Sequence, residues 1–321
     1  MKLRRYSRNP ILKPRGEDWE ALAVFNCGAV KVGDKIHVLY RAVGDYVTYA
    51  SRLGYAVFDE ELNLLERPCD PAFSPDVRFW EMSIEDPRLV ELEGEIYVTY
   101  VTTPTPAPPF AIRRRLGLPK PEQAFPKCAV ARVRGFKEFE RLGVVTPYDA
   151  EERNLVLFPK KVNGRYATLH RPANWVGGDR PVDKPSVWFA WLDGIPGTTY
   201  GHKVVLAPER GWEAKKVGAG PPPIETEKGW ILIYHGVDEK EVYRAGAALL
   251  DLKRPWKVIA RTPEPILEPE EGYEREGDVP NVVFPTGAVA VDEELLVFYG
   301  AADKVCCAAS VGLNELLEDL L

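Results

Sequence analysis

The motif Ile84–Arg88 (IEDPR) contains a group suited to proton transfer. Pro87 follows Asp86 and restricts the residue before it, so we expect an extended backbone at Asp86. A strand-like run starts directly afterwards, which would hold the carboxyl rigidly at the end of a strand. A carboxyl held in this way is suited to general acid catalysis. The alternative is a turn in which Asp86 caps its own backbone.

Three cations in separate segments form a second group. Arg153 stands with Asn154 before a strand-like run, Arg171 ends another, and Lys216 lies in KKVGAGPPP. Each one alone is typical of a surface salt bridge. Together they predict an oxyanion site, because arginine forks match the geometry of phosphate. The run Gly218–Gly220 would let the backbone approach a ligand closely, but no G-K-[ST] spacing makes it a P-loop.

The histidines and tryptophans give a weaker signal. His170 and His235 end strand-like runs, and the default interpretation of both is structural hydrogen bonding. His37 and His202 occupy other points of the sequence, and no H-x-H or H-E-x-x-H motif occurs, so we expect no metal site. Trp175 is a candidate for stacking on a sugar face.

A repeated framework must position these groups. A short aromatic-rich strand recurs five times, and its marker residue is tyrosine in four copies and histidine in the third. The steps between the markers are 60, 70, 64 and 65 residues, which indicates repetition of one supersecondary unit. The marker strands are Ile36–Arg41, Ile96–Val101, Tyr166–Arg171, Ile231–His235 and Leu295–Tyr299, with markers Tyr40, Tyr100, His170, Tyr234 and Tyr299.

Further strand-like runs flank each marker strand, so the sequence predicts an all-β fold, a five-bladed β-propeller. The fifth unit ends after its third strand. We expect Tyr6–Leu12 to supply the fourth and close the ring, because an open ring would expose a sheet edge. The prediction is a single catalytic domain over residues 1–321, with an insertion over 102–127 and a short C-terminal helix over 314–321. The insertion is a lid, an entrance wall, a homo-oligomer contact or a plain surface loop.

A propeller brings the ends of its innermost strands together around one channel. Polar residues that are distant in the sequence therefore converge there. The candidates are Asn26, Arg41, Asp86, Arg88, Arg153, Asn154, His170, Arg171, Lys216, His235, Tyr243 and Asp303.

The composition is that of a soluble globular protein, with 45% hydrophobic and 28% charged residues. The net charge of −6 argues against nucleic-acid and membrane-surface partners, since both need a basic face. We expect no secretory signal and no membrane span. Five scattered cysteines favour reduced core thiols and a cytoplasmic location. Abundant charged residues and 29 prolines favour a thermophilic source.

Segments spread in order over nearly the whole chain carry a family resemblance. They are NPIL (9–12), FNCGAV (25–30), LYRA (39–42), EDPR (85–88), RNLVLFP (153–159), LHRP (169–172), WEAKKVGAGPPPIET (212–226), GWILIYHG (229–236), YRAGAALLD (243–251), PNVVFPTGAV (280–289) and YGAAD (299–303). Through them the chain resembles glycoside hydrolase family 130, five-bladed propeller enzymes that are mostly β-mannoside phosphorylases.

The resemblance implies that Asp86 is the catalytic acid and acts through a hydroxyl of the bound mannose. It implies no cofactor, with inorganic phosphate as a co-substrate. Lys215 adjoins Lys216, so the lysine assignment is open by one position. The implied phosphate-binding residues are Arg153, Asn154, Arg171, Lys216, His235 and Tyr243. The pocket of the transferred mannosyl unit would include Asn26, Arg41 and Asp303, and we place Arg88 and His170 with this group.

The predicted function is reversible phosphorolysis of β-1,4- or β-1,2-linked mannosyl oligosaccharides to α-mannose 1-phosphate. Phosphate is already an anionic nucleophile and needs no base, so one acid beside a cluster of cations fits an inverting phosphorylase. One alternative is a β-mannoside hydrolase on the same propeller, and another is a non-catalytic sugar-binding propeller. The hydrolase would need a second carboxylate, for which the candidates are Glu81, Glu85, Glu225 and Asp303.

Overall fold

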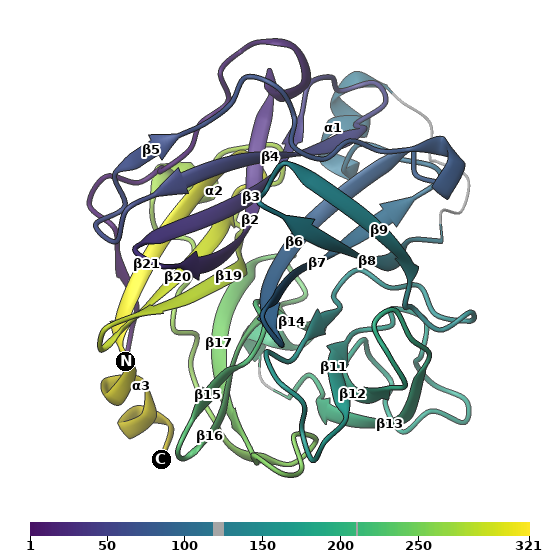
Figure 1. The fold of residues 1–321 in the computed structure, drawn as a ribbon, viewed down its shortest axis with the longest axis vertical. Helices are drawn as coiled ribbons and strands as arrows, with labels where there is room; N and C mark the ends of the chain where they lie inside the picture. The colour runs from purple at the N-terminus through teal and green to yellow at the C-terminus, as the bar shows by residue number, and fades with distance from the viewer. Residues whose placement is uncertain (118–124, 210) are drawn as a thin grey trace.

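Five antiparallel sheets follow one another along the chain and stand in a ring (Figure 1). This computed structural model describes residues 1–117, 125–209 and 211–321. Blades one to three are formed by consecutive strands, and the fourth has an additional short strand at its inner edge. The predicted five-bladed β-propeller is confirmed.

In blades one to four the innermost strand comes first in the chain, whereas blade five takes its outermost strand from the N-terminal segment. The strands of blades one and two are β2 (Ala23–Val32), β3 (Lys35–Val43), β4 (Ser51–Phe58), β5 (Leu64–Glu66), β6 (Ser83–Leu92), β7 (Glu95–Thr103), β8 (Lys127–Arg134) and β9 (Glu138–Val144). Those of blades three and four are β10 (Val156–Leu157), β11 (Tyr166–His170), β12 (Val187–Leu192), β13 (Thr199–Leu206), β14 (Lys216–Ala219), β15 (Ile224–Thr226), β16 (Gly229–Val237), β17 (Tyr243–Leu250) and β18 (Val258–Arg261). Blade five comprises β19 (Val283–Val291), β20 (Glu294–Ala301), β21 (Val305–Gly312) and β1 (Arg4–Arg5).

The N-terminal segment closes the ring, as the sequence predicted. The paired strand is β1, slightly before the predicted Tyr6–Leu12, and Arg5 lies opposite Ala309 of β21. The predicted segment continues this edge, because the Tyr6 amide donates to the Ala308 carbonyl and Leu12 forms a bridge with Cys306. The last blade is therefore made from both ends of the chain, and the two termini lie near each other beside α3 (Leu313–Leu320) in Figure 1.

Apolar side chains fill the spaces between neighbouring blades. Five large clusters of buried residues each draw on two adjacent sheets: Val98 and Leu39, for example, join blades two and one, and Leu232 and Val156 join blades four and three. Strands that are buried on both faces explain why the sequence shows apolar runs rather than strict alternation. Burial of these faces holds the five sheets in a ring and fixes the ends of their inner strands.

A buried glutamate bonds each marker residue at distances of 2.7 to 3.1 Å. In four blades a tyrosine hydroxyl donates to the carboxylate, and an arginine from the fourth strand or just beyond it forms an ion pair with the same group. The sets are Tyr40–Glu20–Arg67, Tyr100–Glu81–Arg141, Tyr234–Glu213–Arg261 and Tyr299–Glu274–Arg5. Blade three has His170 and Glu152, with His202 of β13 on the other ring nitrogen of His170.

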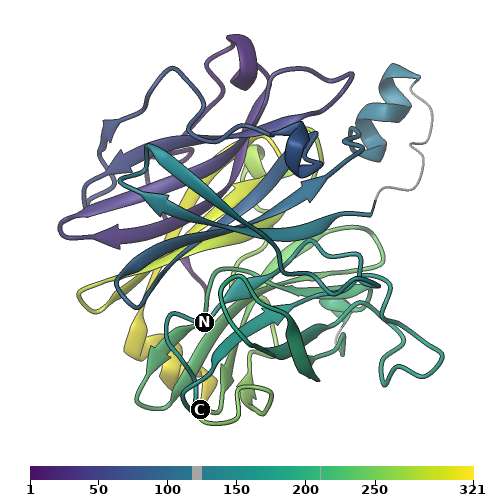
Figure 2. The same ribbon diagram turned by 45° about the vertical axis from the view of Figure 1, so that its right-hand side comes forward.

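Short helices occur outside the sheets. The insertion carries α1 (Phe110–Leu116), which stands beside the sheets in Figure 2, and part of the predicted insertion, 118–124, lies outside the described residues. The predicted C-terminal helix is α3. The remaining helices are η1 (Asp18–Glu20), η2 (Val77–Phe79), η3 (Gly211–Glu213) and α2 (Gly272–Arg275). Among the described residues, no helix is long and apolar enough to cross a membrane.

Candidate active site

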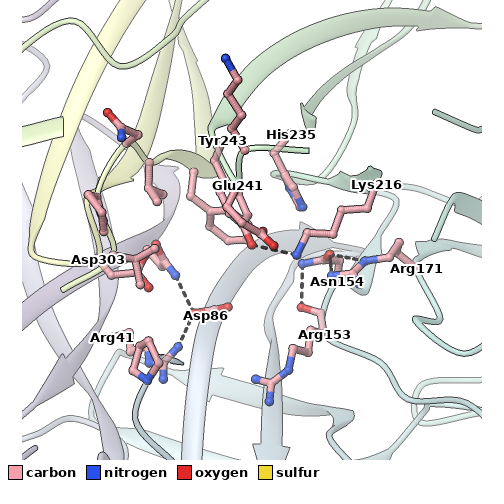
Figure 3. Close-up of a pocket in the computed structure, with 18 residues that line it drawn as sticks. Arg41, Asp86, Arg153, Asn154, Arg171, Lys216, His235, Glu241, Tyr243 and Asp303 are labelled. Carbon is pink, nitrogen blue, oxygen red and sulfur yellow. Dashed lines mark hydrogen bonds and ion pairs between the residues drawn. The ribbon is translucent and has the colours of Figure 1, made fainter. Parts of the chain in front are cut away.

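A cavity of about 600 Å³ lies where the inner strands converge (Figure 3). Inner strands of different blades and the loops beside them contribute its walls. Ten of the twelve residues predicted for the site line it, although they are spread over most of the chain. They are Asn26, Arg41, Asp86, Arg153, Asn154, Arg171, Lys216, His235, Tyr243 and Asp303.

Asp86 reaches the cavity from a β-bulge in β6. The register between β6 and β7 shifts between Glu85 and Arg88, and Asp86 has a φ of 51°. The predicted extended backbone at Asp86 is therefore wrong. Asp tolerates the left-handed region better than most residues, and a bulge redirects a side chain out of the sheet. The bulge in β6 therefore determines the backbone conformation of Asp86, against the preference for an extended backbone that Pro87 imposes.

Asn26 occupies the equivalent bulge of the first blade and meets Asp86. Its φ is 50°, and the shift in β2 falls between Phe25 and Gly28. The Asn26 amide donates to Asp86 Oδ1 at 2.7 Å, and Arg41 Nη1 lies 3.2 Å from the same oxygen. Burial raises the pKa of Asp86, but the nearby arginines and the Asn26 hydrogen bond outweigh it and hold the pKa below its usual value.

Cations and an amide gather on another wall of the cavity. Arg171 Nε and Nη2 both donate to Asn154 Oδ1, at 2.9 and 2.7 Å. Lys216 Nζ donates to the Tyr243 hydroxyl at 2.8 Å. Arg153 Nη1 lies 2.6 Å from a carboxylate oxygen of Glu85. Figure 3 shows the cations and Asn154, from blades three and four, facing one space, which is the geometry of an oxyanion site.

Burial and neighbouring cations weaken the proton affinity of this wall. They lower the pKa of Lys216 to about 8, with burial as the larger cause and Arg171 as the next. Burial also places the pKa of His235 well below its usual value, with Arg171 and Lys216 adding to the shift, so His235 is neutral at pH 7. An anion bound here would relieve the repulsion among these groups.

Gly218 makes room for two of these side chains. A Cβ at this position would lie 2.4 Å from His235 Cε1 and 2.5 Å from Asn154 Oδ1. The predicted close approach of backbone to a ligand is thus a close approach to His235 and Asn154, which stand at the cavity wall.

Arg88 and His170 do not line the cavity. Arg88 is buried behind Asp86, where Nη1 donates to the Asp86 carbonyl and Nε to the Gly220 carbonyl, both at 2.9 Å. His170 is buried between Glu152 and His202. Trp175 is likewise buried, against His170, and does not contribute a wall. These three side chains support the site from behind and offer no surface to a sugar.

The two adjacent lysines, Lys215 and Lys216, have different surroundings. Lys216 lines the cavity, whereas Lys215 extends to the carboxylate of Glu241. Sequence reasoning missed Glu241, Lys240, Pro109, Phe284 and the segment 279–282, all of which line the cavity. The motif PNVVFP was a signal for part of this wall, but the other residues lie in a turn and an insertion that carry no repeat.

The four carboxylates considered for a hydrolase differ in whether they line the cavity. Glu81 is buried in blade two, and Glu225 pairs with Lys160, so neither lines the cavity. Asp303 does line it, and burial, with a smaller contribution from the charge of Asp86, raises the pKa of Asp303 to about 7. Glu85 lines a second, adjoining cavity of about 290 Å³.

Two buried polar atoms at the cavity have no hydrogen-bond partner within the described part of the chain. They are Asn26 Oδ1 and His235 Nδ1. Buried polar groups are normally paired, so such atoms point to a polar ligand. No cluster of three or more His, Cys, Asp or Glu able to hold a metal ion occurs among residues 1–117, 125–209 and 211–321.

Comparison with known proteins gives the family. The family 130 model, described as beta-1,4-mannooligosaccharide phosphorylase, matches residues 2–320. A 1,2-beta-oligomannan phosphorylase of Thermoanaerobacter sp. (strain X514) is 38% identical and covers 98% of this chain and 99% of its own. A beta-1,2-mannobiose phosphorylase of the same strain is also 38% identical, covering 94% of each chain. The structure of the beta-1,2-mannobiose phosphorylase from Listeria innocua with beta-1,2-mannobiose shares the fold, with a TM-score of 0.82 at 23% identity over 100% of this chain and 99% of that one. The chain belongs to glycoside hydrolase family 130.

Proposed function

We propose that the protein is an inverting β-mannoside phosphorylase. It transfers the terminal mannosyl unit of a β-mannoside to inorganic phosphate, giving α-mannose 1-phosphate and a saccharide shortened by one unit. The observation that carries this proposal is one cavity in which a carboxyl, Asp86, faces Arg153, Arg171 and Lys216. Family membership supports the same reaction.

The cations decide between phosphorolysis and hydrolysis. An inverting hydrolase needs a carboxylate base to activate water, whereas phosphate needs only to be held in line with the anomeric carbon. Arg153, Arg171 and Lys216 would hold this anion and offset its repulsion from Asp86. Holding phosphate and sugar together supplies much of the rate through effective concentration. Asp303 also lines the cavity and is the carboxyl that could act as such a base, which makes hydrolysis the second candidate.

In the proposed reaction the glycosidic C–O bond breaks as a phosphate oxygen bonds to the anomeric carbon. Asp86 gives its proton to a mannose hydroxyl, and that hydroxyl passes a proton to the leaving oxygen. Asn26, Arg41 and Asp303 would bind the mannosyl unit, and Asn154, neutral His235 and Tyr243 would complete the phosphate site. The reaction requires no further cofactor.

We propose β-1,2-linked mannosyl oligosaccharides as the substrate. Two relatives with this linkage in their names align over nearly the full chain at 38% identity. The family description names the β-1,4 linkage, so both must be compared. The decisive experiment incubates β-1,2- and β-1,4-mannobiose with and without phosphate and assays mannose 1-phosphate. Release of free mannose at the same rate without phosphate, and no sugar phosphate, would refute phosphorolysis.

We also propose that the protein is cytoplasmic, of thermophilic origin and homo-oligomeric through the 102–127 insertion. Its cysteines are free and all but Cys69 are buried, which suits a reducing compartment. Cell fractionation tests the location, and an extracellular protein would contradict it. A thermal melt tests the thermophilic origin, which a melting temperature typical of mesophiles would contradict. Light scattering of the purified protein tests the oligomeric state, and a monomer would contradict the third proposal.

A further inference from the structure

Glu152 differs from its four counterparts in what it holds. It occupies the position of the buried glutamates Glu20, Glu81, Glu213 and Glu274, and one of its oxygens lies 3.1 Å from His170 Nδ1. Its other oxygen, Oε1, accepts three backbone hydrogen bonds. The donors are the amides of Arg153 at 3.1 Å, Asn154 at 2.9 Å and Arg171 at 2.9 Å.

These three amides belong to residues of the cationic wall. Their side chains line the cavity, and Asn154 Oδ1 in turn receives both nitrogens of Arg171. Glu152 is fully buried, so water does not replace it as an acceptor. One carboxylate oxygen thereby ties the segment before β10 to the end of β11 and sets the direction in which both arginines leave the backbone.

Among the described residues, the side-chain hydrogen bonds of Glu20, Glu81 and Glu274 reach no residue that lines the cavity. Glu274 is the best match, because it is also fully buried and accepts the backbone amides of Glu270 and Glu271. Neither of these residues lines the cavity. The glutamate of blade three has therefore kept its place in the repeat while its hydrogen bonds serve the cationic wall.

We propose that Glu152 is a positioning residue for the phosphate site. It acts through the backbones of Arg153, Asn154 and Arg171, and this inference rests on the proposed assignment of phosphate to that wall. Fixing the donors before the anion arrives removes the cost of ordering them during binding. Loss of Glu152 is expected to weaken phosphate binding and to leave the mannosyl wall, built on blades one, two and five, in place.

Charge and position predict opposite results at this residue. The carboxylate of Glu152 is negative and lies beside the proposed anion site, so removal of its charge alone would tighten phosphate binding. Loss of the three amide contacts would weaken it. Glu152→Leu removes both the charge and the acceptor oxygen, so the sign of the change in phosphate affinity in this variant distinguishes a positioning role from a simple electrostatic one.

The test compares Glu152→Leu, Glu152→Asp and the control Glu274→Leu with wild type. Phosphorolysis of β-1,2-mannobiose gives KM for phosphate and for the mannoside, and a thermal melt with and without phosphate measures binding without turnover. Both Glu152 variants are expected to raise KM for phosphate about tenfold or more and to lose most of the phosphate-induced rise in Tm. KM for the mannoside should stay within about threefold. Glu274→Leu should lower Tm but leave KM for phosphate within about threefold of wild type.

Three results would overturn the inference. They are an unchanged or lower KM for phosphate in Glu152→Leu, an equal rise in Glu274→Leu, and an equal rise in KM for both substrates. If Glu152→Leu does not fold, the same criteria apply to Glu152→Asp, which keeps the charge but is shorter by one methylene. A wild-type protein with no phosphate-dependent turnover would refute the proposed function itself. Normal phosphorolysis by wild type, together with an unchanged KM for phosphate in the Glu152 variants, would refute this inference alone.

Discussion

Removal of the charge of Lys216 offers the sharpest test of the phosphate site. Its pKa is lowered to about 8, so in the empty site the ammonium is charged below pH 8 and neutral above it. Because kcat/KM reports ionisations of the free enzyme, kcat/KM for phosphate should fall about tenfold per pH unit above pH 8. A hydrogen bond to a charged partner contributes about 1.5–3 kcal/mol. Lys216→Met should therefore raise KM for phosphate about 10- to 150-fold at pH 7.

Initial rates of phosphorolysis from about pH 6 to 9.5, with saturating mannoside, measure both effects. Lys216→Arg keeps a cation whose pKa lies far higher, so the alkaline fall should move to higher pH. Lys215→Met is the matched control, because Lys215 pairs with Glu241 and does not line the cavity. It should keep both the phosphate KM and the fall near pH 8. An unchanged phosphate KM in Lys216→Met, or a fall near pH 8 that persists in it, would refute the reasoning.

Asp86→Asn should lower kcat about 10²-fold or more in a protein that still folds, because the amide carries no transferable proton. Normal turnover would show that Asp86 has only a structural role. Gly218→Ala should raise KM for phosphate, since its Cβ would lie 2.4 Å from His235 Cε1. An unchanged KM would show that His235 can move aside without loss of phosphate binding. Arg5→Met leaves the carboxylate of Glu274 buried without its cation and should lower the free energy of unfolding by about 3–5 kcal/mol. Urea denaturation measures this loss, and a smaller change would show that ring closure does not depend on the pair.

The repeat could be predicted from the sequence because every blade needs the same kind of residue at the same position. A tyrosine at the end of the second strand packs between blades and bonds a buried glutamate, so Tyr40, Tyr100, Tyr234 and Tyr299 recur at nearly constant spacing. The five-bladed ring, its closure by the N-terminal segment and the convergence of ten site residues follow from this pattern and from the propeller geometry.

Backbone details were less accessible, because they depend on pairing between strands. Pro87 suggested an extended Asp86, but the bulge of β6 places Asp86 in the left-handed region, and only the register with β7 shows this. Whether a side chain lines the cavity or lies buried behind it was equally hard to predict from the sequence. Arg88 follows the motif in sequence yet turns behind the cavity, because the carbonyls of Asp86 and Gly220 bind its guanidinium.

The structural role of the glutamates was missed for a different reason. Glu152 and its counterparts precede the first strand of their blades, in loops or in the short helices η1, η3 and α2, where no alternation marks them as buried. Its partners are backbone amides, which leave no trace in the sequence. A search for glutamates at the repeat spacing would have found Glu20, Glu81, Glu213 and Glu274 together with it.

The charge of Asp86 links the two walls of the cavity. In the empty site its pKa lies below the ordinary value, because Arg41, Arg88 and the hydrogen bond from Asn26 outweigh the effect of burial. Asp86 is then ionised at pH 7, whereas the proposed acid must carry a proton. Phosphate adds negative charge to the same cavity and offsets the arginines, which raises the pKa of Asp86.

Phosphate binding should therefore be accompanied by proton uptake at Asp86. At about pH 5.5, Lys216 and Asp303 already carry their protons, since their pKa values are about 8 and about 7. Asp86 and neutral His235 can both gain a proton when phosphate binds, and the variant Asp86→Asn isolates the share of Asp86. Titration calorimetry of phosphate in buffers with different ionisation enthalpies gives the number of protons bound. Because phosphate itself can change its protonation, the informative quantity is the difference between wild type and Asp86→Asn. Equal proton uptake by the two proteins would mean that Asp86 gains its proton only when the mannoside binds. Phosphate bound by the cations would then have no part in protonating the acid.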